Sequence, residues 1–176
     1  MWRSPAQAGA WPFTLRGIEA EIALRLGRAV DAETARALTP ESARALIDAM
    51  AVSIEVVDSR WQQGMATPTM LKLADLQSHG ALVLGDWSTY RPMDWSLQVC
   101  RVQVGQQAEV MRQGTHSLGD PAWLLPTWLR HACALHGEVP AGTVVTTGTW
   151  VGILPAEAGD EVRVVFDGIG ETSVRL

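Results

Sequence analysis

Residues 14–28, TLRGIEAEIALRLGR, decide the fold because apolar side chains occupy every second position. These apolar residues are Ile18, Ala20, Ile22, Leu24 and Leu26. Period two is typical of a β-strand with one face in a core, whereas a helix would need a spacing of three or four. Glu19 and Glu21 must therefore lie together on the opposite face of the same strand.

Working outward, the pattern predicts two principal helices and several further strands. One helix is expected over residues 39–50, with Thr39 as N-cap and Pro40 at its first position. The other is expected over 121–137, delayed or kinked at Pro126 and ended by Gly137. Its predicted buried face consists of Trp123, Leu124, Trp128, Leu129, Ala132 and Leu135. Strands are predicted over 52–60, 80–85, 97–104, 108–112, 143–150, 161–166 and 171–176.

This order of elements predicts one α+β domain spanning residues 1–176, with a curled sheet or sandwich as its core. A length of 176 residues is that of one ordinary domain, and 47% hydrophobic residues exclude wholesale disorder. The net charge is −5, and the thirteen arginines and the single lysine, Lys72, form no basic cluster in the sequence, so nucleic-acid binding is not expected.

The compartment is predicted from the cysteines and the N-terminus. Cys100 and Cys133 lack the spacing of a zinc or redox site and are expected to be core thiols in a reducing environment. The first residues contain no continuous apolar stretch of the kind found in secretory signals. The uncharged run 139–156 is broken by Pro140 and Pro155, which favours strand and loop over a membrane span. We therefore expect a cytoplasmic protein that does not enter membranes.

The carboxylates suggest a metal site. Glu19 and Glu21 alone fit a solvated strand face as well as they fit a site. Glu55, however, lies among Val52, Ile54, Val56 and Val57, where an unpaired charge is costly, and a neighbouring strand would bring it to the first two. Three carboxylates without a convergent His or Cys favour Mg²⁺ or Mn²⁺ over zinc. Such an ion would polarise a carbonyl and stabilise an enolate.

Five stretches in order carry a family resemblance. They are GIEAEIALRL (17–26), IEVVDSR (54–60), LADLQSHGALVLGD (73–86), GDPAWLLPTWLRHACALHG (119–137) and AGTVVTTGTWVGILPAEAGDEVRVVFDGIGETSVRL (141–176). Together they resemble the fumarylacetoacetate hydrolase superfamily over about Leu15 to Leu176, and within it the 2-keto-4-pentenoate hydratases of aromatic-compound breakdown. The resemblance implies the curled mixed-sheet roll of that family's C-terminal domain.

The resemblance also implies a metal-dependent reaction. Glu19, Glu21 and Glu55 would hold Mg²⁺ or Mn²⁺, which chelates the carboxylate and 2-oxo group of a small 2-hydroxy-2,4-dienoate. Protonation of the dienol and conjugate addition of water would then give a 4-hydroxy-2-oxo acid. Decarboxylation or C–C bond hydrolysis on the same fold uses the same chelated enolate and stays an alternative. A hydrolase would need a His–Glu pair to activate water, and the sequence shows no confidently matched pair.

Two loops supply the remaining candidates implied by the resemblance. The stretch TTGTW lies beside the substrate in the family, so Thr149 would act as a catalytic hydroxyl and Gly148 would let the backbone approach the ligand. Gln77, Ser78 and His79 occupy the family's D-N-x-S-x-G loop. We assign Ser78 and His79 to catalysis, His79 as a proton-transfer or hydrogen-bonding group, and Gln77 to substrate binding.

Two departures from the family pattern limit these assignments. Leu76 follows Asp75 where the family has Asn, so an amide near the pocket is missing. The family's N-terminal helical segment, whose G-x-K-x-G-like stretch supplies a catalytic lysine, has no counterpart in the eighteen residues before Glu19. Lys72 does not match that motif. A weakly active or inactive metal-binding scaffold is therefore the rival hypothesis.

The other polar and aromatic candidates each have a structural alternative. Arg60 can bind an anionic substrate or pair with Asp58 at a strand end. Trp150 is predicted to form a pocket wall and to contact substrate. His116 can approach the pocket, whereas His131 and His136 fit surface positions on the second helix. The family resemblance further implies a homo-oligomer.

Overall fold

Two long antiparallel strands, β3 (Gly17–Leu26) and β5 (Ile47–Val57), form the centre of the molecule in the computed structural model, which describes residues 1–176. They lie inside a seven-stranded sheet of order β1-β6-β5-β3-β11, in which β12 also pairs with β3 and β7 with β5. The further strands of this sheet are β1 (Trp2–Arg3), β6 (His79–Leu84), β7 (Ser88–Thr89), β11 (Val144–Thr146) and β12 (Leu154–Pro155).

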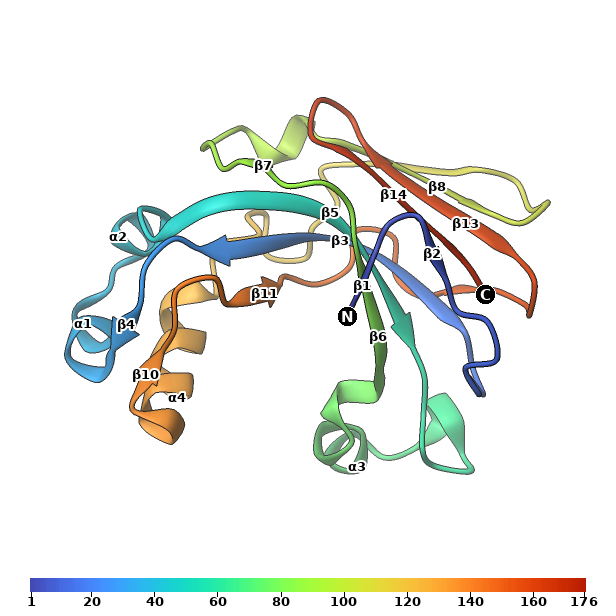
Figure 1. The fold of residues 1–176 in the computed structure, drawn as a ribbon, viewed down its shortest axis with the longest axis horizontal. Helices are drawn as coiled ribbons and strands as arrows, with labels where there is room; N and C mark the ends of the chain where they lie inside the picture. Colours follow the sequence, from blue (N-terminus) through green and yellow to red (C-terminus); the bar gives the residue numbers. More distant parts are fainter.

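A second sheet of five strands packs against the first. Its order is β2 (Ala6–Gln7), β14 (Gly170–Arg175), β13 (Glu161–Phe166), β8 (Val99–Val104) and β9 (Val110–Gln113). Strands β13 and β14 contact β5 and enclose one core with β3 (Figure 1). A short two-stranded sheet joins β4 (Val30–Asp31) to β10 (Glu138–Val139). Both sheets contain parallel and antiparallel pairs, so the predicted α+β class with curled mixed sheets is confirmed.

The helices lie at the ends of the curved first sheet. Helices α1 (Ala32–Ala37), α2 (Pro40–Arg44) and α4 (Leu125–His136) gather at one end, and α3 (Thr69–Ala74) lies beyond the other (Figure 1). Three 3₁₀ turns, η1 (Gly64–Ala66), η2 (Leu76–Ser78) and η3 (Trp95–Leu97), complete the chain. No helix is both long enough and apolar enough to cross a bilayer.

The prediction of a helix over residues 39–50 is wrong for the second half of that range. Thr39 caps α2 as expected, through a reciprocal bond with Ser42, but the helix ends at Arg44. Residues from Ile47 onward belong to β5, where Ile47 and Met50 are buried. Backbone pairing with β3 along the whole of β5 overrides the local helical preference of ALIDAM. Helix α3 is also absent from the predicted elements, which leave residues 61–79 without regular structure.

Helix α4 begins later than predicted, at Leu125, with Pro126 in its first turn, and Gly137 ends it with a positive φ of 80°. Its buried face differs from the predicted one. The buried residues are Leu125, Pro126, Leu129, Ala132 and Cys133, whereas Trp123, Leu124 and Leu135 are exposed. The late start removes Trp123 and Leu124 from the helical register, so the buried stripe turns toward α1 and α2.

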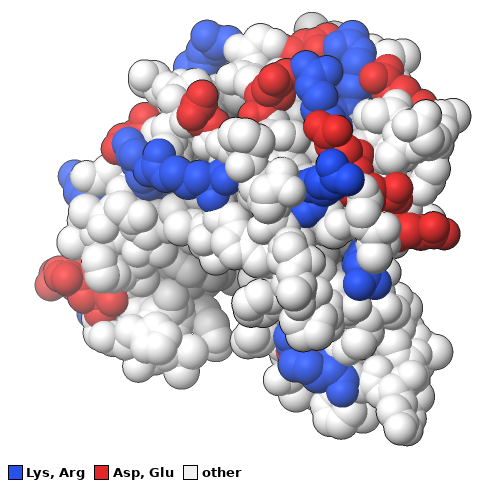
Figure 2. All heavy atoms as spheres, turned by 45° about the vertical axis from the view of Figure 1, so that its right-hand side comes forward, with Lys and Arg blue, Asp and Glu red and all other residues white.

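Charged side chains of both signs are interspersed on the face shown in Figure 2. In the second sheet, ion pairs join Arg101 to Asp167 and Arg163 to Glu171. This face therefore carries no continuous basic stripe of the kind that follows a nucleic-acid backbone.

Candidate functional site

The antiparallel register of β3 and β5 brings three carboxylates together. Glu19 lies directly opposite Glu55, and Glu21 follows two residues along the same face of β3. One oxygen from each carboxylate lies within 4.8 Å of the others. Glu21 is 2% exposed, and Glu19 and Glu55 are partly buried. Alternation along the strands sends the intervening residues, such as Ala20 and Ile54, into the core between the two sheets.

Burial and mutual repulsion make this cluster reluctant to carry its full charge. Burial, followed by the charge of Glu55, raises the pKa of Glu19 to about 7. The same two causes, in the same order, raise the pKa of Glu21 to about 8, although backbone N–H groups of Gly148 and Thr147 oppose the shift. The ion pairs of the structure give these carboxylates no lysine or arginine partner. The excess negative charge is therefore left without a protein cation beside it.

The donor set fits a hard divalent cation. Three carboxylates offer oxygen ligands only, which Mg²⁺ and Mn²⁺ prefer, and they leave further coordination positions for water or ligand oxygens. A cation at this point would also relieve the repulsion that raises the two pKa values.

His79 is the basic side chain that contacts the cluster. It is the first residue of β6, which pairs with β5, and its Nδ1 lies 2.8 Å from Oε1 of Glu55. The ring is 39% exposed. Because Nδ1 is engaged by Glu55, Nε2 is the nitrogen that can exchange a proton with a ligand or with water. The structure thus contains a His–Glu pair that the sequence did not reveal.

Arg60 fixes the loop that carries His79. Its guanidinium donates to the carboxylate and the carbonyl oxygen of Asp75 and, at 3.0 Å, to the carbonyl of His79. These bonds give Arg60 a structural role in holding the loop, and its contact with substrate stays a prediction. The alternative pairing with Asp58 is corrected, because Asp58 instead accepts bonds from Thr14 and Leu15.

The turn between Asp75 and His79 places the two other loop candidates differently. Leu76, Gln77 and Ser78 all have positive φ, between 52° and 66°, a conformation rare in consecutive non-glycine residues. Ser78 is 1% exposed, and its hydroxyl has no hydrogen-bond partner, so the structure gives no support to a catalytic hydroxyl there. Gln77 is exposed, and its side chain makes no hydrogen bond within the chain.

The loop Thr147–Trp150 contacts the cluster through its backbone. The Thr147 N–H donates to Oε2 of Glu21 at 3.1 Å, and the Thr147 hydroxyl donates to the Ile22 carbonyl. Gly148 has a φ of +99°, which suits glycine. Thr147 is absent from the predicted site residues, because its contribution is a backbone group that no residue type encodes. The glycine that follows it, Gly148, was the available signal in the sequence.

Thr149 and Trp150 do not face a ligand site in the expected way. The Thr149 hydroxyl donates to Gly152 and accepts from Val151, which closes a local turn. Trp150 is 2% exposed and packs edge-on against Phe166, with ring centroids 5.2 Å apart. The prediction of Trp150 as a pocket wall is therefore wrong, because the loop turns this side chain into the core between the sheets.

The other histidines separate into buried and exposed positions. His116 is 5% exposed and lies behind the Thr147–Trp150 loop, with Nε2 at 2.7 Å from the Thr147 carbonyl. His131 and His136 are exposed on α4, as expected.

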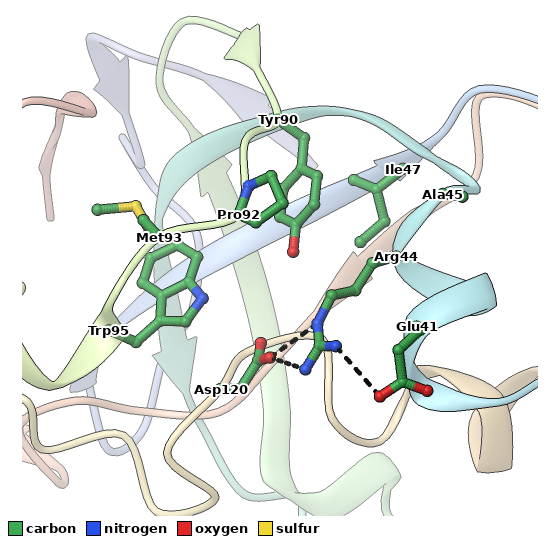
Figure 3. Close-up of a pocket in the computed structure, with 9 residues that line it drawn as sticks. All are labelled: Glu41, Arg44, Ala45, Ile47, Tyr90, Pro92, Met93, Trp95 and Asp120. Carbon is green, nitrogen blue, oxygen red and sulfur yellow. Dashed lines mark hydrogen bonds and ion pairs between the residues drawn. The ribbon is translucent and has the colours of Figure 1, made fainter.

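Two of the cavities that lie away from the carboxylate cluster are lined by polar and aromatic side chains. One of about 440 Å³ lies between α4 and residues Thr146–Gly148, with Leu124, Trp128 and His131 on its helical side. A cavity of about 570 Å³ contains Arg44, Tyr90 and Asp120, and Figure 3 shows Arg44 directed at both Asp120 and Glu41. Neither cavity includes Glu19, Glu21 or Glu55.

Comparison with known proteins gives consistent matches. The sequence profile described as fumarylacetoacetate (FAA) hydrolase C-terminal matches residues 6–176. A 2-hydroxyhexa-2,4-dienoate hydratase of Comamonas testosteroni is 29% identical over 164 residues, which cover 90% of this chain and 59% of the hydratase.

Solved structures with the same fold include two enzymes determined with divalent ions. The 4-oxalocrotonate decarboxylase of Pseudomonas putida G7, complexed with magnesium and adipate, superposes with a TM-score of 0.80 at 22% identity, over 97% of this chain and 63% of that one. Maleylpyruvate hydrolase of Sphingobium sp. SYK-6, in complex with manganese(II) and pyruvate, superposes with a TM-score of 0.59 at 20% identity, over 90% of this chain and 53% of that one. The chain therefore spans about three-fifths of the length of the first relatives it matches.

Proposed function

Since the chain belongs to the fumarylacetoacetate hydrolase C-terminal family, we propose that it is a divalent-metal-dependent hydratase that adds water to a small 2-hydroxy-2,4-dienoate. The product would be a 4-hydroxy-2-oxo acid. The observation that carries the proposal is the group of three carboxylates whose oxygens lie within 4.8 Å of one another, none of which forms an ion pair with a lysine or arginine. The hydratase relative from Comamonas testosteroni supports the substrate class.

In this proposal Glu19, Glu21 and Glu55 hold Mg²⁺ or Mn²⁺. The ion would act as a Lewis acid toward the carboxylate and 2-oxo oxygens of the substrate. The chain's own residues then have separate tasks. The buried wall around Glu21 limits water at the cluster, and the Thr147 N–H orients the Glu21 carboxylate. His79, oriented by Glu55, moves a proton at its Nε2 between the substrate and water.

The test combines cation binding and turnover. Isothermal titration with Mg²⁺ in the presence of oxalate, which imitates the chelating 2-oxo acid, should show saturable binding that Glu21→Gln abolishes. Loss of the absorbance of 2-hydroxypenta-2,4-dienoate should then require the ion and should be slowed by His79→Gln. Binding without turnover would favour the metal-binding scaffold over the enzyme, and no binding would reject both.

A specific observation favours a second candidate, C–C bond hydrolysis. Such a reaction needs a His–Glu pair that activates water, and the 2.8 Å contact between His79 and Glu55 provides one beside the carboxylates. A 2,4-dioxo acid offered to the protein would distinguish the two functions. Cleavage into two carboxylic acids, measured by chromatography, would support the hydrolase, whereas hydration of the dienoate alone would support the hydratase.

We also propose a homo-oligomer in the cytoplasm. The segment from α3 to η2 exposes the apolar side chains of Met70 by 73%, Leu73 by 55% and Leu76 by 71%, and a second copy of the chain could cover them. Cys100 and Cys133 are buried free thiols, compatible with a reducing compartment. Light scattering on the purified chain should give a mass above 19.1 kDa, and a monomeric mass would contradict the assembly.

A further inference from the structure

One peptide group links a buried histidine to the proposed metal site. The peptide between Thr147 and Gly148 presents its carbonyl to Nε2 of His116 at 2.7 Å. Its N–H, that of Gly148, follows the Thr147 N–H, which donates to Oε2 of Glu21 at 3.1 Å, and both N–H groups oppose the rise of that carboxyl's pKa. Because a peptide is planar, with C=O and N–H pointing in opposite directions, a bond that fixes one end also fixes the other.

The hydrogen bonds of His116 identify its tautomer. Nδ1 accepts a hydrogen bond from the Leu118 N–H at 3.3 Å, so it carries no proton. Nε2 therefore bears the hydrogen and donates it to the Thr147 carbonyl. The ring is 5% exposed and lies against Trp150, with centroids 5.6 Å apart, so the donor has little freedom to turn away.

Without a hydrogen bond to its carbonyl, the Thr147–Gly148 peptide plane could rotate, because it is followed by a glycine. Gly148 has a φ of +99° and no side chain, and a glycine beside a peptide permits that peptide to turn over. In the reversed orientation the Thr147 carbonyl, rather than the Gly148 N–H, would face Glu21, and two oxygens would repel each other. A donor behind the loop stabilises the observed orientation.

We propose that His116 is a positioning residue for Glu21, acting through the Thr147–Gly148 peptide and thereby fixing the orientation of one of the three carboxylates. The inference rests on the proposed function, since it assumes that Glu21 is a cation ligand. His116 does not touch the carboxylates. It acts as an outer partner of a ligand, a type of interaction whose loss typically weakens metal affinity by about 10- to 100-fold.

The experiment measures Mn²⁺ affinity by electron paramagnetic resonance of the free ion in wild type, His116→Phe and His116→Gln. Phenylalanine keeps a ring beside Trp150 but cannot donate, whereas the glutamine amide extends far enough to donate to the Thr147 carbonyl. We expect His116→Phe to weaken Mn²⁺ binding by about tenfold or more and His116→Gln to restore most of it. His136→Gln, at an exposed position on α4, is the matched control and should bind like wild type.

A second measurement keeps the inference testable if His116→Phe does not fold. The amide proton of Gly148, observed by NMR without metal, should shift in His116→Asn, whose shorter amide cannot reach the carbonyl, and stay near its wild-type position in His116→Gln. Equal Mn²⁺ affinity in wild type and a folded His116→Phe would overturn the inference and leave the metal site standing. Absence of Mn²⁺ binding by wild type would overturn the proposed function itself.

Discussion

Two groups of carboxylates in this protein differ in what lies beside them. In the cavity of Figure 3, Asp120 accepts bonds from Arg44 at 2.5 and 3.0 Å, and Glu41 lies 3.9 Å from the same guanidinium. The group Glu19, Glu21 and Glu55 has only His79. In the first group an arginine of the protein compensates part of the negative charge, whereas the second group has no lysine or arginine beside it. The difference indicates that the second group is arranged for a cation from solution.

The largest expected effect is the loss of cation binding in Glu21→Gln. The substitution keeps the size of the side chain but removes one charged ligand. Loss of a residue that only contacts a ligand typically weakens metal affinity by about 10- to 100-fold, and we expect a larger loss of Mg²⁺ and Mn²⁺ affinity here. Titration calorimetry measures the change. The metal-free variant should unfold at a higher temperature than wild type, because a buried ionisable group has been removed. Unchanged Mg²⁺ and Mn²⁺ affinity in this variant would contradict the conclusion that the three glutamates are arranged for a cation.

The second-largest expected effect is a pH dependence of the stability of the metal-free protein, caused by the group Glu19, Glu21 and Glu55. Glu19 and Glu21 have folded pKa values of about 7 and 8, above the ordinary 4.5, so the folded chain holds more protons than the unfolded chain between about pH 4.5 and 8. The metal-free protein should therefore lose stability as the pH rises through this window. Thermal unfolding in a chelator checks this, and Mg²⁺ should reduce the dependence. A flat profile in the chelator would contradict the assigned cause.

Removing Arg44 from the first group should lower the stability of the protein and leave cation binding unchanged. In Arg44→Met, Asp120 would lose a partner while remaining 18% exposed, and we expect a loss of about 1–3 kcal/mol, between the values for exposed and buried pairs. Chemical denaturation measures the loss. Mn²⁺ affinity should match that of wild type. A large change in affinity would show that the two groups are coupled.

The smallest effect is expected at Tyr90, whose buried hydroxyl has no partner in the cavity of Figure 3. Burial, the largest cause, raises the pKa of Tyr90 to about 12, so the phenol stays neutral. Tyr90→Phe should leave stability unchanged or raise it by up to about 1 kcal/mol, because no hydrogen bond is lost. A clear destabilisation would reveal a bound water or ligand in this cavity.

The sequence predicted the parts of the site that depend on alternation. Period two in residues 18–26 placed Glu19 and Glu21 on one face, and a charge among valines at Glu55 indicated the neighbouring strand. What it missed depends on tertiary contacts. The orientation of Trp150 follows from a turn at the sheet edge, and the Arg60 bonds follow from how Asp75 and His79 fold back. Helix 39–50 failed because pairing with β3 competes with local propensity.

The bond from the Thr147 N–H to Glu21 joins residues 126 positions apart. Whatever sits among the carboxylates is therefore held by an early strand and a late loop that meet only when the intervening chain has folded. A bound ion would hold the strand and the loop together. Because it binds only where both are in place, it would stabilise the complete fold relative to partly opened forms. Ion retention would consequently report on the integrity of the whole domain, including strands far from the ion.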